Sequence, residues 1–146
     1  MEIKDAEAFL RLVSELKEYT LIVEGKKDAT ALKSLGLRNI IPLNGQPLSD
    51  FADRLDGNRQ TVILTDFDEE GRRLCSRLLK LLQRRRIKAN PRLRRMLTIE
   101  TGILRIEELT NPGVVLTKEK GDYHGEIGAN FYEVHNKGKH KGKGHC

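Results

Sequence analysis

The sequence predicts an α/β fold, with a mostly parallel sheet and helices on both faces. Short, nearly continuous apolar runs, such as residues 20–24 and 61–65, are typical of strands that are buried on both sides. Segments with apolar residues at helical spacing alternate with these runs. The chain has 146 residues, which is enough for a single domain with a real hydrophobic core.

The first half of the chain alternates helix and strand. Asp5 is suited to cap an amphipathic helix over residues 5–18, whose apolar residues recur at helical spacing. A buried strand over residues 20–24 follows, and Asp28 is suited to cap a short helix after it. The pattern then predicts a second strand and a third helix, over residues 39–43 and 47–55.

The second half continues the alternation and then loses it. A third strand over residues 61–65 leads into a long helix with leucines on one side and arginines elsewhere. Residues 87–90 and 103–109 are predicted as further strands, which gives a sheet of about four to five strands. We therefore expect one domain over residues 1–110 and a C-terminal extension over 111–146. The extension ends in a basic, glycine-rich sequence that predicts a flexible tail.

Charge is unevenly distributed along the chain, which has a net charge of +6. No acidic residue interrupts a long basic run in the second half, which is typical of a surface that binds a polyanion. A solvated helix face is the alternative interpretation, and the acidic cluster that adjoins the run makes it less attractive. The run consists of Arg72, Arg73, Arg77, Lys80, Arg84, Arg85, Arg86, Lys88, Arg92, Arg94 and Arg95.

Several other classes of protein are disfavoured. No apolar run approaches the roughly 20 residues that span a bilayer, and the N-terminus does not resemble a secretory signal. The number and spacing of the two cysteines, Cys75 and Cys146, predict neither a disulfide framework nor a C-x-x-C pair. We therefore expect a cytoplasmic protein. The spacing of His124, His135 and the other histidines of the C-terminal extension matches no known zinc pattern.

Carboxylates follow two of the predicted strands. The first strand ends at Glu24, and the third is followed by Asp66, Asp68 and Glu70 in alternating positions. Parallel strands end at the same edge of a sheet, where ligands bind in this class of fold, and alternating residues share a side if the chain stays extended. Hard oxygen ligands of this kind suit Mg²⁺. Each carboxylate alone could be a turn or capping residue, but the set predicts a metal site.

The two acidic segments also resemble the signature motifs of a known family. Val23-Glu24-Gly25-Lys26-Lys27-Asp28 and Thr65-Asp66-Phe67-Asp68-Glu69-Glu70-Gly71 are similar to the motifs of the Toprim domain. This Rossmann-like domain occurs in topoisomerases, bacterial-type primases, nucleases, recombination-repair proteins and maturases of 5S ribosomal RNA. The resemblance extends over about residues 21–109 and is greatest to the small, stand-alone, primase-like Toprim proteins.

The resemblance implies roles for individual residues. Glu24 would act as a general acid or base, Asp66 and Asp68 would hold Mg²⁺ (or Mn²⁺), and Glu70 would be an optional third acidic ligand. Gly25 and Gly71 match the turn glycines of the family. The chain shows no zinc-ribbon or helicase-binding module and no cleavage domain with a catalytic tyrosine, so priming and topoisomerase activity are not expected.

The favoured hypothesis is therefore a Mg²⁺-dependent, nuclease-like protein that acts on RNA or DNA, with structured RNA slightly preferred. A nucleic-acid-binding module without catalysis, in a ribonucleoprotein or repair complex, is the alternative, and a phosphatase that uses the D-x-D aspartate as its nucleophile is a weaker one. The oligomeric state is left open. The residues predicted to contact nucleic acid are Lys26, Lys27, Arg72, Arg73, Arg77, Arg84, Arg85 and Arg86.

Overall fold

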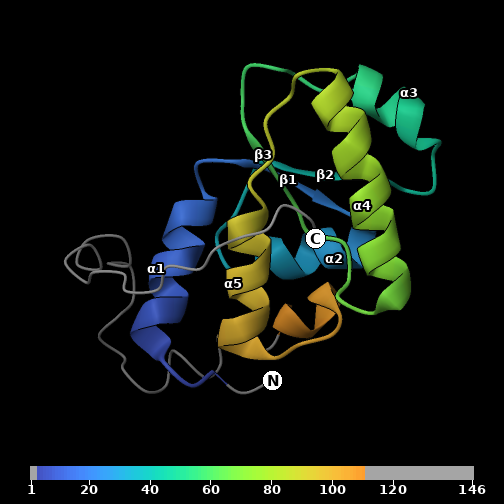
Figure 1. Ribbon diagram of the computed structural model, residues 1–146. Coiled ribbons are helices and arrows are strands. Elements are labelled where there is room, and N and C mark those ends of the chain that lie inside the picture. The colour runs from blue at the N-terminus through green and yellow to red at the C-terminus, as the bar shows by residue number, and fades with distance from the viewer. Residues whose placement is uncertain (1–2, 111–146) are drawn as a thin grey trace.

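A three-stranded parallel sheet forms the centre of the protein, with its strands in the order β2-β1-β3 (Figure 1). The computed structural model describes residues 3–110. The strands are β1 (Thr20–Val23), β2 (Ile40–Pro42) and β3 (Thr61–Ile63). The predicted α/β class is confirmed, although the described part of the chain contains fewer strands than the four to five expected. The extension over residues 111–146, with its predicted tail and histidines, lies outside the described residues.

Helices cover both faces of the sheet (Figure 1). Consecutive residues of β1 point to opposite sides, so that Leu21 and Val23 join one hydrophobic core and Ile22 joins the other. One core contains α1, α2, α5 and the 3₁₀ helix η1, and the other contains α3 and α4. The bounds of these helices are α1 (Ala6–Leu16), α2 (Lys26–Lys33), α3 (Leu48–Asp53), α4 (Glu69–Arg84), α5 (Pro91–Thr101) and η1 (Ile106–Thr110).

The strand order brings the ends of β1 and β3 together. The chain leaves β1 toward β2 by way of α2, and it then crosses to the other side of β1 by way of α3 to form β3. The connections therefore diverge from between β1 and β3, which makes the edge beyond these two strands a topological switch point. Glu24 directly follows β1, and Asp66 lies three residues after the end of β3.

Two segments predicted as strands adopt other structures. Residues 87–90 contribute only an isolated parallel bridge, between Ala89 and Thr61. The strand cannot extend further because Asn90 accepts hydrogen bonds from the first amides of α5 and Pro91 starts that helix. Residues 103–109 form a turn that enters η1 at Ile106 rather than a strand. Within residues 3–110 there is no helix with the length and hydropathy needed to cross a bilayer.

The helix starts agree only partly with the predicted caps. Asp5 caps α1, because its carboxylate accepts a hydrogen bond of 3.1 Å from the Ala8 amide. The sequence predicts Asp28 as the cap of α2, but that helix begins two residues earlier, at Lys26. Asp28 instead occupies the third position of the helix and accepts a hydrogen bond of 3.2 Å from the Gly25 amide. At this position the Asp28 carboxylate lies within electrostatic reach of Glu24.

Candidate metal and nucleic-acid site

Glu24 and Asp66 meet at the switch point of the sheet. The Leu64 amide donates to the Ile22 carbonyl at 2.7 Å in the ladder between β3 and β1. Two residues further on, the Asp66 amide donates to the Glu24 carboxylate at 3.0 Å. The Glu24 side chain thus takes the place of a backbone acceptor where the strands separate. The sequence-based expectation that these two strand ends lie together agrees with this contact.

Three carboxylates at this edge are held in the same way. One oxygen of Glu24 accepts from the Asp66 amide, as above, one oxygen of Asp66 accepts from the Ile106 amide at 2.9 Å, and one oxygen of Asp68 accepts from the Gly71 amide at 2.8 Å. Among the described residues, the second oxygen of each carboxylate accepts no hydrogen bond. Each side chain is therefore oriented by backbone and keeps one oxygen available for a ligand.

Gly71 allows the strand end and α4 to pack closely against one another. A Cβ atom at this position would lie 2.6 Å from the carbonyl carbon and 2.9 Å from the nitrogen of Asp66, which is too close for any side chain. The Thr65 hydroxyl donates to the Gly71 carbonyl at 2.7 Å and reinforces the contact. Gly25 is different, since a Cβ atom there would meet nothing within 4 Å. Of the two glycines in the motifs, only Gly71 is required by space.

Burial and mutual repulsion perturb these acids. Loss of solvation raises the pKa of Glu24, and the neighbouring charges of Asp66, Asp68 and Glu70 raise it further, against the hydrogen bond from the Asp66 amide. Burial also raises the pKa of Asp66, with Asp68 and Glu107 adding to the effect and the Ile106 hydrogen bond and Arg105 opposing it. Repulsion among the carboxylates thus adds to the effect of burial, and a bound cation would relieve that repulsion.

Asp28 is a site residue that the sequence-based analysis missed. It is 8% exposed, and burial raises its pKa to about 6, with repulsion from Asp66, Glu24 and Glu107 adding to the shift. The sequence predicts Asp28 only as a helix cap. Its position four residues after Glu24, in a segment that reverses into a helix, could have indicated that it lies near the site. Glu107 is another acidic residue near the site, because η1 brings it within electrostatic reach of Asp28 and Asp66.

Glu70 occupies a different position from the one that an extended chain would give it. Asp68 caps α4 and the helix begins at Glu69, so the alternation of Asp66 and Asp68 does not continue to Glu70. Glu70 is exposed in the first turn, where its charge still acts on Glu24. Its role as a metal ligand stays a prediction.

The donor set suits a hard cation, although it does not form a complete cage. Carboxylate oxygens are the ligands that Mg²⁺ prefers, and the ion usually takes only one or two of them and completes its shell with water and phosphate oxygens. Within residues 3–110, no three acidic, histidine or cysteine side chains already lie in an arrangement that could hold a metal ion. Asp66 and Asp68, each with one available oxygen, fit the smaller requirement.

Four basic residues, which we call the basic stripe, follow one face of α4. They recur at intervals of four, three and four residues, the spacing of neighbours on a helix surface, and all four are exposed. In the described part of the chain, the last three have no ion-pair or hydrogen-bond partner, and the first pairs with Glu69 at 2.9 Å. The stripe consists of Arg73, Arg77, Lys80 and Arg84.

The other basic residues predicted to contact nucleic acid lie at three places. Lys26 and Lys27 are exposed in the first turn of α2, which begins two residues after Glu24. We call the edge of the sheet that carries Glu24, Asp66 and Asp68 the acidic edge. Arg72 is exposed near it, and one of its guanidinium nitrogens donates to the Phe67 carbonyl at 2.9 Å. Arg85 and Arg86 lie at the far end of α4, about 24 Å from its start for a helix of 16 residues. There Arg85 pairs with Asp53 at 2.8 Å, so it is already partly neutralised.

The fold, the switch-point carboxylates and the two motifs define the class of protein. The family model of the Toprim domain matches residues 20–96, and the chain belongs to the Toprim domain family.

Individual proteins of known sequence or structure are also similar to this chain. The chain is 44% identical over 77 residues to the UPF0292 protein of Thermococcus kodakarensis, a match that covers 51% of this chain and 58% of that protein. It is 37% identical over 112 residues to the UPF0292 protein of Methanocaldococcus jannaschii, covering 70% of this chain and 88% of that protein. The match thus extends over about three-fifths of the Thermococcus protein. A solved structure of a protein from Aquifex aeolicus is similar with a TM-score of 0.60 and 30% identity, covering 66% of this chain and 94% of that one.

Proposed function

We propose that this protein carries out Mg²⁺-dependent phosphodiester chemistry on nucleic acid, in the manner of a nuclease. The observation that carries the proposal is the shared anchoring of Glu24, Asp66 and Asp68, each of which has one oxygen on a backbone amide and one available oxygen. This arrangement orients ligands before the metal arrives, which lowers the cost of ordering them on binding. Mn²⁺ would be accepted by the same oxygen ligands.

The acidic residues would have different roles in the reaction. Asp66 and Asp68 would hold the ion, and a bound Mg²⁺ would supply positive charge against a phosphate oxygen and lower the pKa of a coordinated water. Glu24 would take or give a proton, a role that its raised pKa favours, because a general base works best when its pKa approaches the working pH. Glu70, in the first turn of α4, would be an optional further ligand.

The basic residues support a polymeric substrate over a small phosphate ester. The basic stripe extends away from the acidic edge for eleven residues, or about 16 Å along the helix axis. A small substrate would not reach these cations, whereas a strand with regularly spaced phosphates would meet several of them. Lys26 and Lys27, on the other side of Glu24, would contact the same backbone. RNA and DNA both meet this requirement.

Substitution of the proton-handling and metal residues tests the proposal. Glu24→Gln and Asp66→Asn remove one charge each with little change of shape, and we expect each to reduce Mg²⁺-dependent cleavage of labelled RNA or DNA by at least about 100-fold. Glu18→Gln is the matched control, because Glu18 is exposed beyond the opposite end of β1. Unchanged cleavage in both site variants would refute the proposal.

A non-catalytic binding module is the second candidate. The observation that favours it is that the described residues contain no preformed group of three metal ligands. In that case the basic stripe would bind nucleic acid with a steep dependence on salt, and the acidic edge would regulate that binding or have lost its activity. Incubation of labelled RNA with and without Mg²⁺ separates the two candidates: tight binding without any product in either condition would favour the binding module.

A further inference from the structure

Arg94 is a charged residue in the interior of the protein. It lies on α5, belongs to the basic run that the sequence assigned to nucleic acid, and is only 3% exposed. Its guanidinium therefore cannot reach a phosphate on the surface. In the described part of the chain it pairs with no carboxylate, so its burial calls for another explanation.

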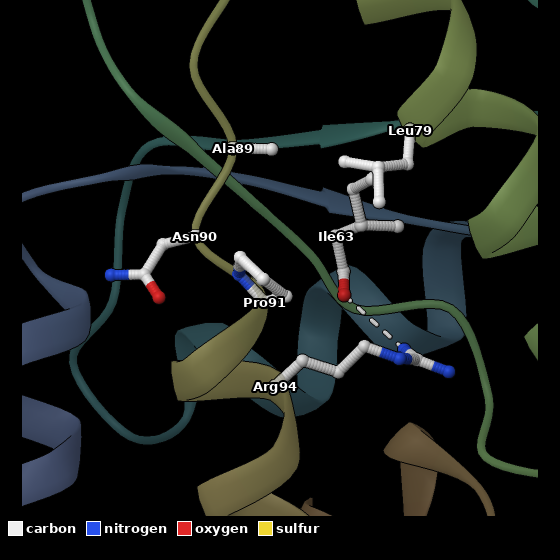
Figure 2. Close-up of a pocket in the computed structure, with 6 residues that line it drawn as sticks. All are labelled: Ile63, Leu79, Ala89, Asn90, Pro91 and Arg94. Carbon is white, nitrogen blue, oxygen red and sulfur yellow. Dashed lines mark hydrogen bonds between the residues drawn. The ribbon is translucent and has the colours of Figure 1, made fainter. Parts of the chain in front are cut away.

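Within residues 3–110, the guanidinium of Arg94 takes the place that a fourth strand would occupy beside β3. On the outer edge of β3, Thr61 exchanges hydrogen bonds with the backbone of Lys88 and Asn90, and the described residues provide no further backbone pairing along this edge. The next carbonyls along this edge, of Ile63 and Thr65, accept hydrogen bonds from Arg94 at 3.2 and 2.7 Å. Figure 2 shows the side chain reaching from α5 toward the Ile63 carbonyl, beside the small pocket that Pro91 and Leu79 help to line.

The same guanidinium also contacts the acidic edge. A second nitrogen donates to the carbonyl of Asp66 at 3.0 Å, and the guanidinium carbon lies 4.6 Å from the centre of the Phe67 ring. One planar group thus contacts three carbonyls and an aromatic face along the segment that carries the candidate metal ligands. Only arginine offers several donors in a rigid, planar arrangement of this kind.

Closing a sheet edge does not by itself require a charge. Burial of an unpaired cation costs energy, and burial lowers the pKa of Arg94 to about 10. The carboxylates of Asp66 and Glu24 oppose this shift, which means that they stabilise the charged form. The neighbouring charge of Arg72 lowers the pKa of Arg94 further, so the two carboxylates only partly offset the cost of burying this cation.

We infer that Arg94 is a positioning residue of the candidate metal site. It holds the carbonyl side of residues 63–66, so that the Asp66 amide stays on Glu24 and the Asp66 carboxylate stays on the Ile106 amide. It touches neither metal nor substrate and acts only through Asp66 and Phe67. The inference rests on the proposed function only for the consequence that the metal binds more tightly.

Amide hydrogen exchange tests the positioning directly, without metal. In Arg94→Lys one ammonium keeps the charge but cannot donate in the same plane to all three carbonyls, so we expect exchange at the Asp66 amide to accelerate at least tenfold. The amide of Ile22, in the central strand, should change less than twofold. Arg92→Met is the control, because Arg92 is exposed on the same helix and its ion pair with Glu15 is remote from the site. We expect it to leave both amides unchanged.

The possible outcomes separate positioning from general stability. Selective acceleration at Asp66 supports the inference, whereas unchanged exchange there, or equal acceleration at Ile22, overturns it. If Arg94→Lys does not fold, the wild-type protein decides: the guanidinium protons of Arg94 should exchange no faster than the Asp66 amide, because both are released by the same opening. Rapid exchange of the guanidinium beside a protected Asp66 amide would overturn the inference.

Metal affinity gives the second readout. Titration with Mn²⁺ alone should show about tenfold weaker binding for Arg94→Lys than for the wild type and for Arg92→Met. Absence of Mn²⁺ binding in the wild-type protein would count against the proposed function and leave the positioning to be decided by exchange. Equal Mn²⁺ affinity in a folded Arg94→Lys variant would overturn the positioning and leave the proposed function intact.

Discussion

The acidic edge and the basic stripe are built by different physical means, although they lie on adjoining segments of one chain. The acidic edge joins the ends of β1 and β3 with a residue from η1, through contacts such as Asp66 to Glu24 and Ile106 to Asp66. The basic stripe is local, since its four members follow from the period of α4 alone. The first region depends on tertiary structure and the second only on an intact helix.

The difference determines how each region should respond to mutation. Changes at the acidic edge are expected to alter stability and geometry together, because its side chains are partly buried and bonded to backbone. Changes in the basic stripe are expected to alter binding alone, because exposed cations contribute little to folding even where one of them, Arg73, forms a surface ion pair. Three sets of substitutions test whether the two regions differ in this way.

Gly71→Ala should be the most damaging. The new Cβ would overlap the backbone of Asp66, so either α4 or the strand end must move, at a cost of about 3 kcal/mol or more. We expect lower unfolding free energy in urea and loss of Mn²⁺ binding. Gly25→Ala, where the Cβ would meet nothing within 4 Å, should cost less than about 1 kcal/mol. Equal effects of the two substitutions would show that the close contact at Gly71 is unimportant.

Asp28→Asn should stabilise the metal-free protein at neutral pH. The pKa of Asp28 rises from 3.8 to about 6 on folding, so its contribution to stability is fully present below pH 4 and is lost as the pH rises through 6. We expect the variant to gain on the order of 2–3 kcal/mol at pH 7.5, and less toward pH 4, in urea unfolding with a chelator.

The exposed Asp50 of α3 provides the control for this experiment. Asp50→Asn should leave the dependence of stability on pH as it is in the wild type. If the stability of Asp28→Asn depended on pH as that of the wild type does, ionisation of Asp28 would not destabilise the folded protein. Repulsion and burial at the acidic edge would then cost less free energy than expected.

Neutralising the middle of the basic stripe should weaken binding and spare the fold. The double substitution Arg77→Gln and Lys80→Gln removes two cations, so the slope of log affinity against log salt should fall by about 1.5. We expect about tenfold weaker binding of labelled RNA or DNA at low salt and a melting temperature within a few degrees of the wild type. These quantities are measured by fluorescence anisotropy across a salt series and by thermal unfolding.

A matched pair of cations elsewhere shows whether position matters. Lys17 and Arg38 are exposed and lie near the amino ends of β1 and β2, away from the acidic edge. Their double substitution to glutamine changes net charge by the same amount and should alter the salt slope much less. An equal loss in the two double variants would mean that net charge, rather than the basic stripe, determines binding.

The same contrast explains how much could be predicted from the sequence. Local patterns predicted the fold class, most helices and the exposure of the arginines on α4. The rule that parallel strands end at one edge brought Glu24 and Asp66 together without a structure. Both successes rest on short-range periodicity or on a general property of the fold.

The residues that were missed or misplaced depend on contacts distant in sequence. Asp28 has the sequence signature of a helix cap, and only the start of α2 at Lys26 turns it toward the acidic edge. Arg94 is one arginine among many until α5 docks against the outer edge of β3. The expected fourth strand failed for the same reason, because a side chain can satisfy carbonyls that a pattern assigns to backbone.

The contact at Gly71 has a mechanical consequence. Because the backbone of Asp66 packs directly against Gly71 in the first turn of α4 and the Thr65 hydroxyl donates to the Gly71 carbonyl, the strand end cannot shift along the helix without breaking these contacts. The helix therefore fixes the distances between the acidic edge and the cations of the basic stripe. A polymer bound to these cations would present the same phosphate to the carboxylates each time, whatever its base sequence.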